Sequence, residues 1–194
     1  MPSDPPLILA FDTSAAHCAV ALLKGNESLS HATQDMIKGQ SECLMPMLEN
    51  TLKTTGHTWQ DLDLIAVGTG PGNFTGVRIA VATARGLALA LEVRALGVST
   101  FEALAYGTKG AFRVVLDGRR DQVFVQDFKD GVATNAPRVQ QADMGASIKI
   151  HASAESIARF AAANLKADRP RPAPLYLRAP DAALPAEPAP IILP

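Results

Sequence analysis

Residues 62–91 read LDLIAVGTGPGNFTGVRIAVATARGLALAL, and this stretch decides the fold. Residues 62–67 form a mostly apolar run that is typical of a buried strand. A glycine-rich loop follows over 68–73, where small residues permit positive φ and close approach of another backbone. Asn73 is a suitable N-cap, and the residues after it predict a long helix over 74–91. The stretch therefore predicts a strand, a tight loop and a helix.

The flanking sequence supplies more elements of both kinds. Gly25-Asn26 is a strong hairpin signal between two strands, and the second of these is more polar and therefore nearer an edge. Apolar residues at Leu44, Leu48 and Leu52 mark one helical stripe, and Pro46 would kink that helix or delay its start. Ser99 is expected to cap a further helix. The expected strands are 7–11, 18–23, 27–33, 62–67 and 93–96. The expected helices are 41–53, 74–91 and 100–106.

The order β-β-β-α-β-α-β-α predicts a mixed sheet with helices packed on it. Two copies of this plan make the two-lobed actin/Hsp70/sugar-kinase (ASKHA) type of α/β fold, and here the second copy is abridged. Its predicted parts are a hairpin of strands 112–116 and 123–128 and one helix over about 154–164. The chain from residue 169 onward is rich in Pro and Ala, which favours an extended arm or a disordered tail. The expected lobes are 1–98 and a reduced 99–178, followed by a tail over 179–194.

Composition limits the classes of function. The 194 residues carry a formal net charge of −1 and no visible basic stripe, whereas a protein that grips RNA phosphates usually shows one. If this protein serves RNA chemistry, a partner is therefore expected to hold the RNA. The N-terminus lacks the basic start of a signal peptide, and no run reaches about 18 uninterrupted apolar residues. These features predict a cytoplasmic protein with no membrane segment.

Two segments are candidates for a phosphate or nucleotide site. Residues 70–76 offer glycines before a helix N-terminus, and the turn 12–14 could hold a hydrated Mg²⁺. No Lys-Ser/Thr pair follows the glycines, so this is not a P-loop, and Glu92 precedes the next strand, which excludes a dinucleotide fingerprint. Both segments are equally read as ordinary tight turns. The candidate residues are Asp12, Thr13, Ser14, Gly70 and Gly72. The four histidines fall at no metal-ligand spacing, and no catalytic constellation is visible.

The helix over 74–91 is apolar nearly all round, so more than one side must be buried. Gly76, Ala80 and Ala84 add a smooth ridge, and Met45 and Met47 on the preceding helix are adaptable in contacts. One interpretation is burial under the chain's own second lobe; the favoured one is a partner interface. The expected interface residues are Leu44, Met45, Met47, Leu48, Phe74, Thr75, Gly76, Val77, Ile79, Ala80, Thr83, Ala84 and Leu87.

Four segments carry a resemblance to a known family. GPGNFTGVR at 70–78 resembles the GPGSFTGVR signature of the TsaB (YeaZ) family, with Asn73 in place of Ser. ILAFDTS at 8–14 is similar to the family's opening ILAIDTS, LGVST at 96–100 to its GVST segment, and YLR at 176–178 to its C-terminal YLR. The nine-residue string is highly specific, whereas the others are individually weak but occur in the right order.

The resemblance implies an actin/Hsp70-like fold and a non-catalytic scaffold. Such proteins bind the larger catalytic paralogue TsaD and work with the ATPase TsaE, and the assembly attaches threonylcarbamoyl to N6 of adenosine 37 in tRNAs that read ANN codons. The helices over about 41–53 and 74–91 would contact TsaD or a second copy in a homodimer. No cofactor of its own is implied; ATP and Mg²⁺ belong to the complex, and tRNA is a partner only indirectly.

This sequence departs from the family's catalytic pattern in one respect and from the family's length in another. TsaD binds its metal through a His-x-x-x-His pair, and residues 39–44 here, GQSECL, contain none, which argues against transferase activity. The chain is also shorter than most relatives after about residue 129. The alternative function is a weak ATPase or transferase that uses Asp12, Thr13 and the loop 70–72 on nucleotide.

Overall fold

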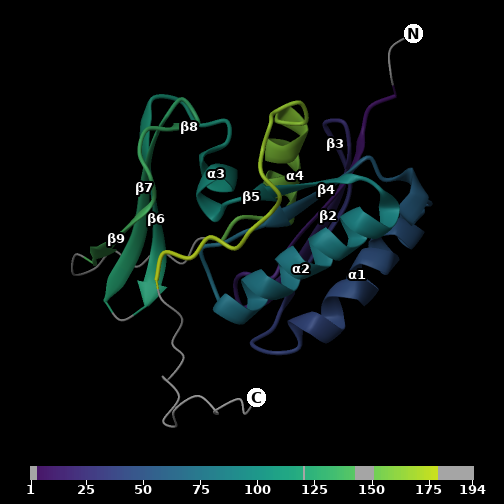
Figure 1. Ribbon diagram of the computed structural model, residues 1–194, viewed down its shortest axis with the longest axis horizontal. Coiled ribbons are helices and arrows are strands. Elements are labelled where there is room, and N and C mark those ends of the chain that lie inside the picture. Colours follow the sequence, from purple (N-terminus) through teal and green to yellow (C-terminus); the bar gives the residue numbers. More distant parts are fainter. Residues whose placement is uncertain (1–3, 120, 143–150, 179–194) are drawn as a thin grey trace, which may run out of the picture.

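The computed structural model describes residues 4–119, 121–142 and 151–178, and it places them around two sheets (Figure 1). The first sheet has the order β3-β2-β1-β4-β5. Its members are β1 (Leu7–Asp12), β2 (His17–Lys24), β3 (Glu27–Asp35), β4 (Leu64–Gly68) and β5 (Arg94–Val98). β1, β2 and β3 are antiparallel, whereas β1, β4 and β5 run parallel. This is the mixed sheet that the sequence predicts, and the predicted α/β fold class is confirmed.

Helices cover both faces of the first sheet, which explains why β1 is buried along its whole length. α1 (Gln40–Thr54) and α2 (Phe74–Leu91) lie on one face, and α4 (Ala154–Ala163) lies on the other (Figure 1). Because successive strand residues point to opposite faces, Leu9 and Phe11 pack with the α1/α2 side and Ile8 packs with the α4 side. β3 is exposed at the sheet edge, as its polar sequence predicts.

The second sheet is smaller and packs on α3 (Thr100–Ala105). It contains β6 (Ala111–Arg119), β7 (Gln122–Lys129), β8 (Val132–Ala133) and β9 (Arg138–Gln141). The hairpin of β6 and β7 is confirmed, whereas β8 and β9 were not predicted. β8 has two residues and β9 is largely exposed, so neither has the apolar run by which a strand is recognised.

Two predicted features differ in detail from the structure. α1 begins at Gln40, so Pro46 lies inside the helix and does not delay its start. Residues 169–178 form an extended arm as expected, but the arm packs on the body: Leu175 donates its backbone N–H to the carbonyl of Thr69 at 2.8 Å. α4 follows the second sheet in sequence and packs on the first, so the lobe boundary at residue 98 stays a prediction. The tail over 179–194 lies outside the described residues.

The N-terminus of α2 offers a test of local stability. The side chain of Asn73 accepts hydrogen bonds from the backbone N–H groups of Thr75 at 3.0 Å and Gly76 at 3.4 Å. Asn73→Ala removes both acceptors and is expected to lower the free energy of unfolding by about 1 kcal/mol, as measured by urea denaturation. Asn73→Ser keeps a capping oxygen and should stay close to the native value. Equal stability of the two variants would contradict this role of the cap.

Candidate functional site

The turn 12–14 and the glycine-rich loop are packed directly against each other. Thr13 Oγ1 donates to the carbonyl of Gly76 at 2.6 Å, and the backbone N–H of Asn73 donates to the carbonyl of Ser14 at 2.6 Å. A Cβ atom at Gly76 would overlap the Thr13 carbonyl oxygen, and one at Gly72 would overlap the Ser14 carbonyl oxygen. The glycines therefore meet a packing requirement, since only a bare backbone fits at this distance.

The Asp12 carboxylate is buried and already has partners within the chain. Ser14 donates to it through Oγ at 2.8 Å and through its backbone N–H at 3.2 Å. His17 Nε2 lies 3.0 Å from Asp12 Oδ2. Asp12 is 3% exposed and Thr13 is fully buried. These contacts favour the reading of 12–14 as a structural turn, because the groups that would meet a metal or a phosphate are engaged by protein.

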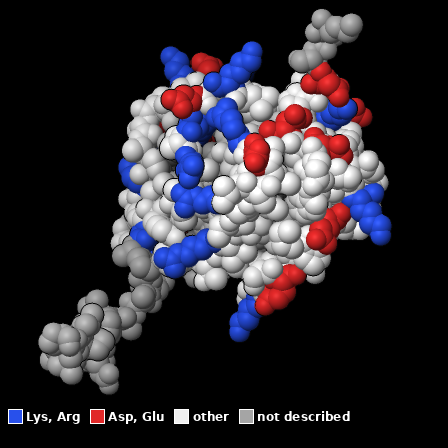
Figure 2. Space-filling model, turned by 45° about the vertical axis from the view of Figure 1, so that its right-hand side comes forward, with Lys and Arg blue, Asp and Glu red and all other residues white. Residues whose placement is uncertain are grey.

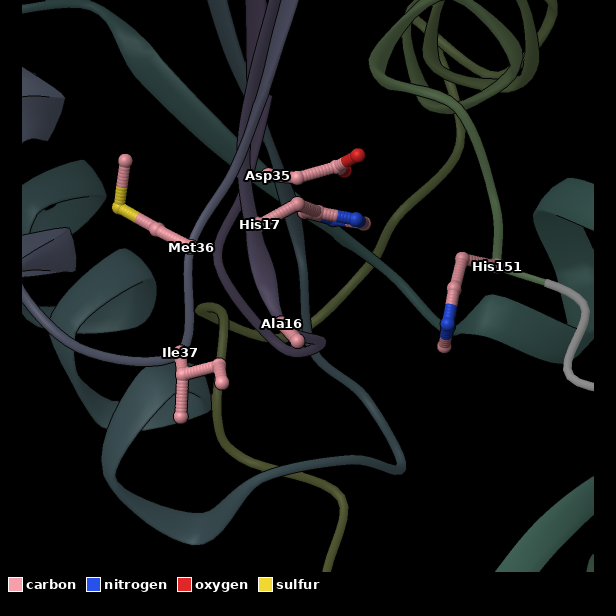
Figure 3. A pocket seen from close by; sticks show the side chains of 6 residues that line it. All are labelled: Ala16, His17, Asp35, Met36, Ile37 and His151. Atoms are coloured by element: carbon pink, nitrogen blue, oxygen red, sulfur yellow. The ribbon is translucent and has the colours of Figure 1, made fainter.

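A pocket of about 420 Å³ that the sequence did not suggest is lined by Ala16 and His17, which follow this turn. Figure 3 shows the His17 ring and the Asp35 carboxylate pointing to the side from which His151 approaches, while Met36 points the other way. The rings of His17 and His151 meet edge to face at 5.6 Å. His17 and Asp35 face each other across β2 and β3, and His151 comes from far along the chain. Strand pairing brings His17 and Asp35 together, and a tertiary contact adds His151. No spacing in the sequence therefore reveals this group of residues.

Neither a metal cluster nor an activated thiol is found in the described part of the chain. No group of three or more His, Cys, Asp or Glu residues there is arranged to hold a metal ion. Cys18 is fully buried, and this burial, with a smaller contribution from the neighbouring Cys43, raises the pKa of its thiol to about 12. Cys18 is therefore protonated at neutral pH and cannot act as a thiolate nucleophile.

The expected interface residues divide into two groups. Six of them are buried in the core between the helices and the sheet: Leu44, Leu48, Gly76, Val77, Ala80 and Ala84. The other seven are half-buried or exposed: Met45, Met47, Phe74, Thr75, Ile79, Thr83 and Leu87. The small-residue ridge of α2 thus faces the chain's own sheet, and only the second group is accessible to a partner.

The outward face of α2 contains accessible residues that the sequence analysis did not name. Ala82, Gly86, Leu89 and Ala90 are exposed, with Leu89 at 82%. Together with Met45, Met47, Ile79, Thr83 and Leu87 they form what we call the α1/α2 face. Figure 2 shows a broad surface with few charged side chains in the middle of this view. Helical phase groups these residues on the side opposite Gly76, Ala80 and Ala84, but it does not say which of the two sides is buried.

α2 is also long and apolar enough to span a membrane by length and composition alone. One such helix is weak evidence, since core helices pass the same test. Here the helix is held at its N-terminus by the Asn73 cap and packs through Ala80 and Ala84 on the first sheet. An apolar outward face on a helix that packs in this way is the usual character of an interface.

The two glycines of α2 provide a matched pair for a stability test. Gly76→Ala is expected to lower the free energy of unfolding by about 3 kcal/mol, because the added Cβ overlaps a backbone carbonyl that cannot move aside. Gly86→Ala meets nothing within 4 Å and should raise stability by up to about 1 kcal/mol, the helix preference of Ala over Gly. Urea denaturation measures both. A Gly76→Ala protein as stable as the native one would refute the close contact with the turn.

The two cysteines should differ in reactivity. Cys18 is buried, and its raised pKa keeps the thiol protonated. Iodoacetamide at pH 8 is therefore expected to leave it unmodified in the native protein. Cys43 is only partly buried and should react. Both should react once the chain is unfolded in urea, and mass spectrometry of the peptides measures each site. Fast native modification of Cys18 would contradict its burial.

Comparisons with known proteins agree with this fold. The family model described as "TsaD: tRNA N6-adenosine threonylcarbamoyltransferase" matches residues 6–180. An uncharacterized protein of Mycobacterium tuberculosis is 32% identical over 90% of this chain and 93% of its own length. The Escherichia coli tRNA threonylcarbamoyladenosine biosynthesis protein TsaB is 37% identical over 128 residues, which cover 63% of this chain and 54% of that protein.

A solved structure agrees with these sequence matches. It is an uncharacterized protein with similarity to peptidase YeaZ from Pseudomonas aeruginosa, and it superposes with a TM-score of 0.76 at 27% identity. The match covers 89% of this chain and all of that one. The sequence match to TsaB, the family model and this structural match converge on one group. The chain belongs to the TsaB (YeaZ) family.

Proposed function

We propose that this chain is a non-catalytic subunit that binds the catalytic paralogue TsaD, together with the ATPase TsaE, for N6-threonylcarbamoylation of adenosine 37 in tRNAs reading ANN codons. The observation that carries the proposal is the α1/α2 face. It leaves large apolar side chains such as Leu89 exposed on a helix whose other side is packed in the core. The named activity of TsaB relatives, tRNA threonylcarbamoyladenosine biosynthesis, supplies the pathway.

The state of the turn 12–14 supports a binding role over catalysis. Asp12 is the acidic group best placed for nucleotide chemistry, at the end of the central strand β1. Its carboxylate is instead engaged by Ser14 and His17, and the loop after β4 is packed onto the turn. The competing proposal, a weak ATPase or transferase that uses Asp12, Thr13 and the loop 70–72, would require these two segments to separate.

The accessible part of the α1/α2 face suits either of two occupants. Met45 and Met47 are half-buried side chains that adapt to a partner surface, and Ala82, Gly86 and Ala90 let another helix approach closely. TsaD and a second copy of this chain would use the same face, so homodimer formation would compete with assembly of the complex. We propose TsaD as the productive occupant.

Gly86→Arg tests the interface without disturbing the fold. Residue 86 is exposed in the C-terminal half of α2 and has no neighbour within 4 Å of an added Cβ, so the variant should fold with native or greater stability. A long cation at the centre of an apolar contact is expected to weaken association with TsaD by about 30-fold or more. Ala163→Arg, exposed at the end of α4 on the opposite side of the sheet, is the matched control.

The measurement is co-purification with TsaD, followed by titration calorimetry of the separate chains. Retained association of Ala163→Arg and lost association of Gly86→Arg would support the proposed face. Equal affinity of both variants for TsaD would show that the partner binds elsewhere. Tight Mg-ATP binding by the isolated chain that Asp12→Ala abolishes would instead favour the nucleotide-dependent alternative.

A further inference from the structure

The arm, taken here as the turn 165–168 with the extended residues 169–178, runs from α4 across the edge of the first sheet to the second sheet (Figure 1, yellow). Pro172 is buried beside Gly97, where an added Cβ would overlap Thr69 Cγ2 at 2.8 Å and lie only 3.3 Å from Pro172 Cα. Leu175 and Leu177 pack against the core of the second sheet. Three prolines, at 170, 172 and 174, restrict the backbone of the arm. The arm is therefore a rigid part of the surface.

Two arginines from elsewhere in the chain are held against the arm by neutral oxygen atoms. Arg94 of β5 donates through Nη1 to the carbonyl of Leu165 at 2.6 Å and through Nη2 to that of Ala167 at 3.0 Å. Arg78 of α2 donates through Nε to the hydroxyl of Tyr176 at 2.8 Å. Among the described residues neither arginine has a carboxylate partner. These contacts orient the guanidinium groups and leave their positive charge in place.

The arm and the residues bonded to it carry an excess of positive charge. Among the described residues, six cations belong to this set, against the carboxylates of Asp168, Glu102 and the adjacent Asp117, which leaves an excess of three in a chain of net charge −1. Glu102 pairs with Arg169 at 2.6 Å, and Arg178 donates to the carbonyl of Gly118, the residue after Asp117. Figure 2 shows Lys and Arg gathered on one part of the displayed face, beside the weakly charged surface. The six cations are Arg78, Arg94, Lys166, Arg169, Arg171 and Arg178.

Aromatic rings lie within this set of cations. Tyr176 is 42% exposed, and its ring lies 4.6 Å from that of Phe74 between centroids. The Arg78 guanidinium lies 3.7 Å over the Phe74 ring. Cations beside an accessible aromatic ring are the combination that binds the backbone and the unstacked bases of nucleic acids. The positive charges alone would suffice to bind an acidic protein surface, whereas an exposed aromatic ring also offers a stacking surface for a base.

We propose that the arm with Arg78 and Arg94 binds the phosphate backbone of the tRNA when this chain is part of the complex; this rests on the proposed function. An extended run of ten residues spans roughly 30 Å, along which one strand of a duplex presents roughly nine phosphates. The proposal revises the expectation that tRNA is reached only through a partner. The catalytic subunit holds the reacting nucleotide, and this chain holds a second part of the same RNA.

Lys166→Glu combined with Arg171→Glu tests the proposal. Both side chains are exposed, and no hydrogen bond or ion pair of either is seen in the described structure, so the variant should fold normally. In the assembled complex with TsaD and TsaE, affinity for an unmodified transcript of an ANN-reading tRNA is expected to fall about tenfold or more. The slope of log affinity against log salt should decrease by about 1.5, since two cations are lost. Lys109→Glu combined with Lys129→Glu, also exposed and away from α1 and α2, is the matched control.

Fluorescence anisotropy at several salt concentrations measures RNA binding, and co-purification measures assembly in the same preparations. A drop in tRNA affinity for the arm variant, with the control unchanged and both complexes intact, supports the proposal. Equal tRNA affinity of the two variants overturns it and leaves the proposed function standing. Loss of TsaD or TsaE from the arm variant alone also overturns it, because the arm would then bind protein. Failure of the native chain to co-purify with TsaD would refute the proposed function itself.

Discussion

The backbone contact between the start of α2 and the turn 12–14 is the constraint on which the rest of the structure depends. Gly76 places its carbonyl against the Thr13 hydroxyl at 2.6 Å, at a separation that leaves no room for a Cβ atom. This contact sets the height of α2 above β1 and β4, and Ala80 and Ala84 continue the same close approach. It also packs the glycine-rich loop onto the turn 12–14, so the segment that resembles a phosphate loop positions a helix.

With α2 held so close, Ala82, Gly86, Leu89 and Ala90 on its opposite side stay exposed in the described part of the chain. The helix contains few polar groups, so the side that faces away from the sheet is apolar as well. Leu89 on that side remains exposed. The second sheet does not cover this side, because it packs on α3 and receives the arm. The apolar α1/α2 face is thus a direct result of the contact at Gly76, and it forms the surface on which a partner can act.

The arm joins the two sheets and gathers positively charged side chains on one part of the surface. Arg94 and Arg78 come from a strand and a helix, yet both reach the arm and are oriented by it. A net charge of −1 hides this arrangement, because charge balance over a whole chain says nothing about how the charges are distributed in space. The weakly charged face and the basic part of the surface lie side by side (Figure 2), as the two proposals together require.

The sequence by itself determined the elements and their order. Apolar runs, the Gly25-Asn26 turn and the caps at Asn73 and Ser99 are local signals, so β1 to β7 and all four helices were predicted, with bounds off by a few residues. Tertiary structure alone decided which side of α2 is buried, because helical phase gives two opposite faces without saying which one meets a sheet. Tertiary structure also decided that β8 and β9 form, that the arm packs on the two sheets, and that Arg78 and Arg94 meet at the arm. Each of these depends on contacts between residues far apart in the chain, which no local pattern encodes.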